Sequence, residues 1–265
     1  MNVNYVLAGR LRREYILPPA GRPLIDVPGG SLLHAAAGLS VWESGIGLLA
    51  RVGEDYPHEW LKDFSRRGWD VGGVFILPQA IDQRYFQASP EPGTLQHTNP
   101  VAHFARLGLP FPKSLLGYTP QAQSEDDLQS SPDDSPRPVD IPAGYLEARA
   151  IHLCPLDFRT TNRLTSTFRQ AGSAVLTLDP SPGYMKADAL ESVHVLLRGV
   201  TAFLVAEQHL RSLYWGRSTD LWEMAAAVAE FGCEFVVVRR GGQGQYLYET
   251  TSRRRWEIPA YPARL

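Results

Sequence analysis

A glycine pair that runs directly into a helix-forming stretch is the part of this sequence best suited to hold a ligand. Residues 29–39 are Gly-Gly-Ser-Leu-Leu-His-Ala-Ala-Ala-Gly-Leu. Glycines let a ligand approach the backbone, and free N–H groups at a helix start favour oxygen-rich ligands. Ser31 is placed to cap this helix, and the alanines allow close packing on a sheet. The same pattern is also typical of a simple turn before a helix.

The elements that must position these residues alternate between strands and helices. Several apolar runs are continuous rather than alternating, as in strands buried on both faces of a parallel sheet. Helices are predicted after Pro57, ending at Gly68, and after Asp220. This alternation predicts βαβ units and a layered α/β domain. The predicted strands are Asn4–Leu7, Ile46–Val52, Ala150–Pro155, Ala174–Asp179, Ala202–Val205 and Phe235–Arg239.

Composition and charge exclude several classes of protein. The chain has 265 residues, 44% hydrophobic and 20% charged, which is ordinary for a globular domain. The net charge of −2 gives no field to attract nucleic acid or an anionic membrane. No apolar stretch is long enough to span a bilayer, and no signal-peptide profile is present. Cys154 and Cys233 each lie in an apolar run without metal-ligand spacing, which favours buried thiols in a reduced cytoplasm.

Two regions depart from the βαβ pattern. Residues 74–105 contain β-type residues, among them Val74, Phe75 and Ile76, broken by Pro and Gly, which predicts a small antiparallel excursion from the main sheet. Residues 121–142 are rich in Asp, Ser and Pro and poor in apolar side chains. That composition predicts a flexible acidic surface loop, with an acidic interaction segment as the alternative.

The order of motifs resembles that of the ribokinase/PfkB carbohydrate kinase family. That family's first signature combines Gly-Gly with a later V-G-x-D turn, a helix and a G-V-D-like turn. Later stretches resemble the family's D-x-N/S strand end, its K-x-N-E turn and its V-T-x-G-x-x-G nucleotide turn. The matching residues are Gly29, Gly30, Val52, Gly53, Asp55, Gly68 and Asp70, then Leu178–Pro180, Ala202–Glu207, Val236–Gly244 and the hairpin Tyr246–Glu257.

This resemblance implies a three-layer α/β/α ribokinase-like fold over residues 1–265, with its C-terminal part missing. A small β lid would be formed by about residues 10–28 and 74–105, and closing it over substrate would exclude water. Two lids pairing edge to edge in a homodimer would protect their exposed strands. The implied partner is a small-molecule sugar or nucleoside, and nucleic acid and membrane are not implied.

On the substrate side, the resemblance points to Glu14, Gly29, Gly30, His34 and Arg84. Glu14 takes the place of the family's hydroxyl-binding Asp, although a solvated charge beside two arginines fits as well. Gly29 and Gly30 would bring backbone close to the sugar. His34 replaces the family's Asn and can still donate or accept a hydrogen bond, or simply pack at the helix start. Arg84 would belong to the lid, with an exposed hairpin as the alternative.

On the nucleotide side, the resemblance implies ATP and Mg²⁺ as cofactors. Gly241 and Gly244 would form a backbone turn against the phosphates, with Arg239 or Arg240 supplying positive charge, although a hairpin turn fits the same spacing. The family's N-x-x-E motif falls on residues 206–209, where both defining residues have changed. Glu207 is the remaining carboxylate that could assist in metal binding.

The family's second signature, D-T-x-G-A-G-D, provides an anion hole and the Asp that acts as catalytic base, which phosphoryl transfer requires. No Gly-Ala-Gly-Asp occurs in these 265 residues, so no catalytic residue is assigned and the expected Asp would lie beyond Leu265.

The first hypothesis is therefore an ATP-dependent sugar or nucleoside kinase that is inactive as this chain. The alternative is a non-catalytic relative that binds a sugar or nucleotide. A dinucleotide enzyme of the Rossmann type would need G-x-G-x-x-G after the first strand, but Gly9 is followed by Arg10, Leu11 and Arg12.

Overall fold

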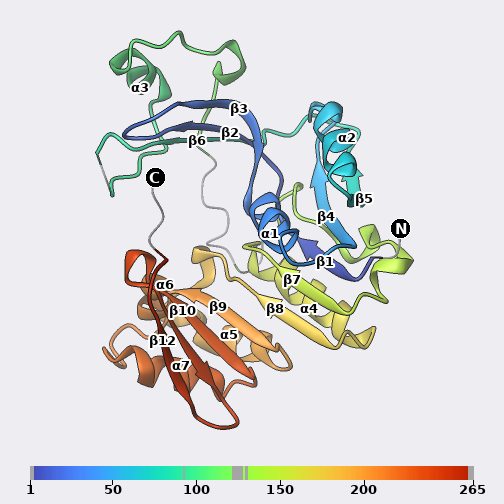
Figure 1. The fold of residues 1–265 in the computed structure, drawn as a ribbon, viewed down its shortest axis with the longest axis vertical. Helices are drawn as coiled ribbons and strands as arrows, with labels where there is room; N and C mark the ends of the chain where they lie inside the picture. The colour runs from blue at the N-terminus through green and yellow to red at the C-terminus, as the bar shows by residue number, and fades with distance from the viewer. Residues whose placement is uncertain (1–2, 92, 121–127, 129–130, 262–265) are drawn as a thin grey trace.

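The chain forms a nine-stranded sheet with a separate three-stranded sheet above one end of its strands (Figure 1). The structure is a computed structural model that describes residues 3–91, 93–120, 128 and 131–261. The large sheet has the order β12-β11-β10-β9-β8-β7-β1-β4-β5. All pairs from β10 through β5 are parallel, whereas β11 and β12 form an antiparallel hairpin at the edge. The predicted α/β fold is confirmed.

The strand bounds agree closely with the apolar runs of the sequence. Because strands β1, β4 and β7 are covered on both faces, their residues are apolar at consecutive positions, apart from Arg51 of β4 and His152 of β7. The strands of the large sheet are β1 (Tyr5–Ala8), β4 (Ile46–Val52), β5 (Trp69–Ile76), β7 (Ala150–Leu153), β8 (Val175–Leu178), β9 (Ala202–Ala206), β10 (Phe235–Arg239), β11 (Gln245–Glu249) and β12 (Arg255–Ile258).

Helices pack on both faces of this sheet and enclose two hydrophobic clusters. Leu7 of β1 packs in the cluster under the first two helices, whereas its neighbours Val6 and Ala8 face the cluster under the later ones. This alternation gives the three layers. The helices are α1 (Ser31–Leu39), α2 (His58–Arg66), α4 (Phe158–Gln170), α5 (Leu190–Leu197), α6 (Glu207–Leu213) and α7 (Leu221–Ala229), and α3 (Pro100–Arg106) packs on the small sheet.

The small sheet lies where the lid was predicted and is called the lid below, but its bounds differ. It has the order β3-β2-β6, formed by Leu24–Gly29, Arg12–Leu17 and Arg84–Ala88. Its strand from the second predicted segment, β6, pairs with β2 in parallel rather than antiparallel. Val74, Phe75 and Ile76 do not belong to it, because they continue β5 and pair in parallel with β4. The sequence prediction of a lid from residue 74 onward was therefore wrong at its start. Pro78 and the following polar residues end β5 there.

The acidic stretch 121–142 also differs from its prediction where it is described. Residues 121–127 and 129–130 lie outside the described residues, but 131–142 do not form a solvated loop. Asp134 and Ser135 are 4% and 1% exposed. Asp140 accepts two hydrogen bonds from Arg51 of β4, with N–O distances of 2.6 and 2.8 Å. Composition alone missed this, since the arginine partners lie 89 or more residues away in the sequence.

The Arg51–Asp140 pair should contribute strongly to stability, because both side chains are 5% exposed or less. Replacing Asp140 with Asn leaves a buried guanidinium without its carboxylate, which typically costs about 3 kcal/mol. Chemical denaturation should show that loss. The exposed pair of Asp63 with Arg66 provides the control, and Asp63→Asn should change stability by less than about 0.5 kcal/mol. Equal effects of the two substitutions would contradict this account.

A second stability prediction concerns His152 of β7, whose Nδ1 lies 2.9 Å from the Thr177 hydroxyl. Burial and the nearby Arg239 lower the pKa of His152 to about 4. The unfolded chain therefore binds a proton on His152 at a higher pH than the folded chain does. The free energy of unfolding should decrease as the pH falls from about 6.5 to about 4. The expected loss is about 3 kcal/mol. Urea denaturation at a series of pH values should show a flatter profile for His152→Gln, and an unchanged profile would contradict the prediction.

Candidate functional site

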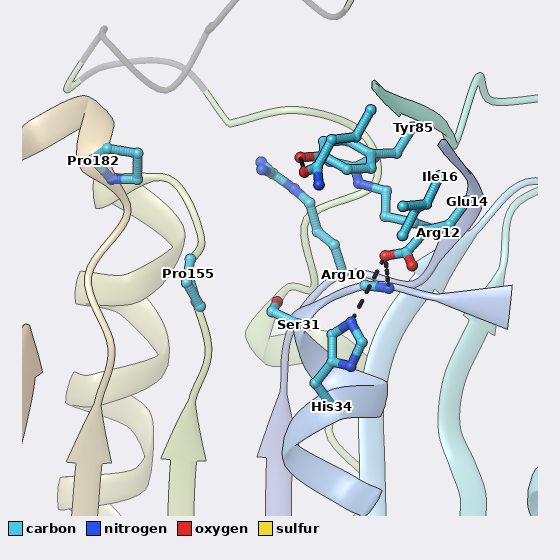
Figure 2. Close-up of a pocket in the computed structure, with 11 residues that line it drawn as sticks. Arg10, Arg12, Glu14, Ile16, Ser31, His34, Tyr85, Pro155 and Pro182 are labelled. Atoms are coloured by element: carbon cyan, nitrogen blue, oxygen red, sulfur yellow. Dashed lines mark hydrogen bonds and ion pairs between the residues drawn. The ribbon is translucent and has the colours of Figure 1, made fainter. Parts of the chain in front are cut away.

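A cavity of about 550 Å³ lies between the lid and the carboxyl ends of the central strands (Figure 2). In open α/β sheets, ligands bind at this edge of the strands. The lid contributes β2 and β6, the main sheet contributes the residues that follow β1, β7 and β8, and α1 contributes its first turn. The lining residues are Arg10, Arg12, Glu14, Ile16, Gly30, Ser31, His34, Tyr85, Gln87, Pro155 and Pro182.

Glu14 is the central acidic group of this cavity. Its side chain is buried, and its Oε1 accepts a hydrogen bond from the Gly30 backbone N–H at 2.7 Å. A Cβ on Gly29 would lie 2.0 Å from the Glu14 carboxyl carbon, so only glycine leaves room for the carboxylate. Gly30 has φ +99° and a Cβ there would lie 2.4 Å from the Arg10 carbonyl oxygen. The glycine pair thus holds Glu14 at the helix start.

His34 lies across the cavity mouth from Glu14, one turn into α1 (Figure 2). Its Nε2 is 3.9 Å from Glu14 Oε1, and its side chain is 74% exposed. The prediction of a packed histidine at the helix start does not describe this position, whereas a ligand contact remains compatible with it. Ser31 also lines the cavity, but it is not the helix cap: Gly30 is the N-cap residue and no side chain caps α1.

Arg84 is not among the residues that line the cavity. Its guanidinium is paired with Asp82, and it donates to the Ser114 and Leu116 carbonyl oxygens at 3.0 and 2.8 Å. The neighbouring Tyr85 and Gln87 of β6 face the cavity instead. The substrate-binding role of Arg84 thus remains a prediction, and its observed contacts favour a part in holding the lid together.

The predicted nucleotide residues lie together near the carboxyl ends of β8 and β10. Arg239 ends β10 and pairs with Asp179, which follows β8. Gly241 begins a short turn with φ +56° and open space around its Cα. Gly244 is required for another reason, because a Cβ there would lie 2.0 Å from the Ile258 carbonyl oxygen of β12. The hairpin turn therefore explains why residue 244 is glycine. It does not explain Gly241, which remains a candidate for contact with a ligand.

Glu207 begins α6 and bridges two arginines. Its Oε1 accepts from Arg211 Nε at 2.9 Å, and its Oε2 accepts from Arg240 Nε at 3.1 Å. Burial alone would raise the pKa of Glu207, but these hydrogen bonds outweigh it and hold the pKa below its usual value. Within residues 3–91, 93–120, 128 and 131–261, no three His, Cys, Asp or Glu side chains gather in a way that could hold a metal ion. A carboxylate that already pairs with two arginines is poorly suited to bind a metal ion.

Sequence reasoning missed the arginines and the lid residues of the cavity. Arg10, Arg12 and Glu14 occupy every second position from just before β2 into the strand. This spacing puts side chains on one face of a strand, so it could have indicated that all three line the cavity. Tyr85 and Gln87 alternate in the same way on β6. Which face of each strand meets the cavity depends on how the lid is placed over the main sheet, and no local pattern fixes that.

These features define the class of fold, which is ribokinase-like. No family model matches the chain. A cytidine kinase of Thermococcus kodakarensis is 24% identical over 262 residues, which cover 98% of this chain and 80% of the relative.

Among solved structures, an E. coli protein classed provisionally as ribokinase II, in complex with ATP and Mg²⁺, matches with a TM-score of 0.69 at 13% identity, over 99% of this chain and 80% of its own. A nucleoside kinase of Burkholderia thailandensis in complex with inosine matches with a TM-score of 0.64 at 15% identity, over 98% and 76%. The ribokinase-like fold that the motifs implied is thereby confirmed.

Proposed function

We propose that this chain belongs to an ATP-dependent kinase of the ribokinase/PfkB family, which phosphorylates a hydroxyl group of a sugar or nucleoside. The observation that carries the proposal is the buried Glu14 carboxylate, held by the Gly30 N–H in a cavity beneath the lid. A carboxylate is the strongest hydrogen-bond acceptor available for vicinal hydroxyl groups. Similarity to a cytidine kinase and to an inosine-bound nucleoside kinase supports a polyhydroxylated substrate.

ATP and Mg²⁺ are the proposed cofactors, supported by the structural neighbour solved with both. Arg239 and Arg240 provide positive charge at the carboxyl edge of the sheet, and they are followed by Gly241, where a Cβ would meet no atom within 4 Å. These groups fit a polyphosphate. When bound, ATP supplies the phosphoryl group. Glu207 is better suited to orienting Arg240 than to binding the metal directly, so no step is assigned to it through Mg²⁺.

The 265-residue chain is expected to bind its ligands without turning them over. The sequence contains no Gly-Ala-Gly-Asp, and Glu14 is a binding group engaged with the Gly30 N–H. Such a chain lacks the base that would accept the proton of the attacking hydroxyl. The second candidate, a non-catalytic sugar- or nucleotide-binding protein, is favoured by Ala206 and His209, which replace both defining residues of the N-x-x-E motif. A small molecule is the proposed partner in both cases.

The test combines binding with phosphoryl transfer. Cytidine, inosine and ribose are titrated into the chain by calorimetry, with and without ATP and Mg²⁺, and transfer from γ-labelled ATP is followed in the same samples. We expect saturable binding of at least one acceptor and of ATP, with no transfer above the background. Absence of binding by all three acceptors would overturn the proposed function. Phosphoryl transfer at ordinary kinase rates would show that this chain contains a catalytic base, and would establish that it is an active kinase.

The proposed location of the protein is the cytoplasm, and its proposed assembly is a homodimer. The part of the chain that the structure describes contains no helix long and apolar enough to cross a membrane. Cys154 and Cys233 are both buried free thiols, which supports the proposed cytoplasmic location. Pairing of two lids in a homodimer remains a prediction, for which the exposed Leu24 and Ile25 on β3 offer an apolar edge.

A further inference from the structure

One buried carboxylate holds both arginines of the acceptor cavity. Asp134 is 4% exposed, and its Oδ2 accepts from Arg12 Nη1 at 2.9 Å. Its Oδ1 lies 3.3 Å from Arg10 Nε. Both arginines line the cavity, whereas Asp134 stands behind them and comes from a segment more than 120 residues away in sequence. Asp134 is therefore an ion-pair partner that two cavity side chains share, and it lies outside the lid.

A chain of hydrogen bonds anchors Asp134 and its neighbour to the main domain. The Ser135 hydroxyl accepts from Arg10 Nη2 at 3.2 Å and donates to Asp157 Oδ2 at 2.7 Å. Asp157 is fully buried and caps α4, accepting from the Thr160 backbone N–H at 2.9 Å. Because Asp157 is fixed by a helix start, the segment that carries Asp134 cannot shift without breaking a buried network. The arginines are thus preorganised before any ligand binds.

The charges around the cavity are nearly balanced by this arrangement. Arg10 and Arg12 bring two positive charges to one wall, and the carboxylates of Asp134 and Asp157 lie within 4 Å of these guanidinium groups. Glu14 adds a negative charge inside the cavity. At such short range in a partly desolvated site, one unbalanced charge changes the preference for neutral over anionic ligands strongly. A neutral polyol is compatible with a cavity wall whose charges are balanced. A phosphorylated polyol is disfavoured because no positive charge is left to neutralise it.

We propose that Asp134 is a positioning and specificity-determining residue of the acceptor cavity. It holds Arg10 and Arg12 as a rigid, charge-balanced wall that favours neutral sugars or nucleosides over their phosphate esters. The inference rests on the proposed function of the same cavity. It predicts that removing the Asp134 charge changes the preference for neutral ligands over their phosphate esters, in addition to lowering stability.

The test compares a neutral ligand with its phosphate ester. Affinities for cytidine and cytidine 5′-monophosphate, and for ribose and ribose 5-phosphate, are measured by calorimetry for the wild-type chain and for Asp134→Asn. The neutral-to-ester affinity ratio should fall about tenfold or more in Asp134→Asn, because one positive charge of the wall formed by Arg10 and Arg12 is then no longer neutralised. Arg12→Gln removes a positive charge and should move the ratio in the opposite direction, which gives a second variant should Asp134→Asn fail to fold.

Asp140→Asn is the matched control, since it lies on the same segment but pairs with Arg51, which does not line the cavity. It should lower stability and leave the ratio unchanged. An unchanged ratio in Asp134→Asn, or an equal change in Asp140→Asn, would overturn the inference while leaving the proposed function intact. If the wild-type chain binds none of the four compounds and does not bind inosine, the proposed function fails and the inference fails with it.

Discussion

Replacing Gly30 with alanine should abolish ligand binding and destabilise the protein by about 3 kcal/mol. Gly30 has φ +99°, a conformation that an L side chain rarely adopts. The new Cβ would lie 2.4 Å from the Arg10 carbonyl oxygen, which is backbone and cannot swing away. Relief of this clash must move the Gly30 N–H off Glu14 and disturb the start of α1. Thermal denaturation and calorimetric titration together measure both effects.

Gly38 provides the matched control on the same helix. A Cβ there would meet no atom within 4 Å, and the position is helical. Gly38→Ala should therefore stabilise the protein by about 0.5–1 kcal/mol through a less flexible unfolded chain, with unchanged binding. If Gly30→Ala behaved like Gly38→Ala, the geometry described for the glycine pair would be incorrect.

Replacing Glu14 with glutamine should weaken binding of the acceptor about 10- to 100-fold while sparing stability. The amide oxygen of Gln can still accept the Gly30 N–H, so the buried donor stays satisfied and stability should change by less than about 1 kcal/mol. The charged acceptor for ligand hydroxyls is lost, and a hydrogen bond to a charged group is worth about 1.5–3 kcal/mol. Calorimetric titration measures the loss of affinity.

Two further variants sharpen the Glu14 prediction. Glu14→Ala should lose binding and, in addition, about 1–3 kcal/mol of stability, because the buried Gly30 N–H is left without an acceptor. Glu59→Gln, on the exposed face of α2, removes the same charge from the protein far from the cavity and should leave affinity unchanged. Equal affinity of wild type and Glu14→Gln would show that Glu14 does not contact the ligand.

Much of the fold could be predicted from the sequence because its signals are local. The run from Ile46 to Ala50 is apolar at consecutive positions, and the structure buries all of β4, Arg51 included. The Pro57 and Gly68 boundaries bracket α2 because proline fixes the helix start and glycine permits the positive φ at its end. The hairpin at Tyr246–Glu257 was instead inferred from the resemblance, since its strands β11 and β12 mix polar and apolar residues.

The candidate site was predicted in part, and its gaps have a physical cause. Glu14, Gly30 and His34 come from different elements but meet in one cavity, as the motif order implied. Asp134 and Asp140 could not be found in this way. In sequence they belong to an acidic, proline-rich stretch, and only the folded chain brings Arg10, Arg12 and Arg51 to them. Burial of charge depends on long-range pairing, which composition does not record.

Hydrogen–deuterium exchange with and without ligand tests the central claim most directly, because it locates binding along the chain. The chain is compared alone and with saturating cytidine, inosine or ribose. The account predicts slower exchange in peptides that cover β2 (Arg12–Leu17) and the start of α1, including the Gly30 amide, for at least one of these ligands. Unchanged exchange with all three, or slowing confined to elements away from the lid, would contradict it.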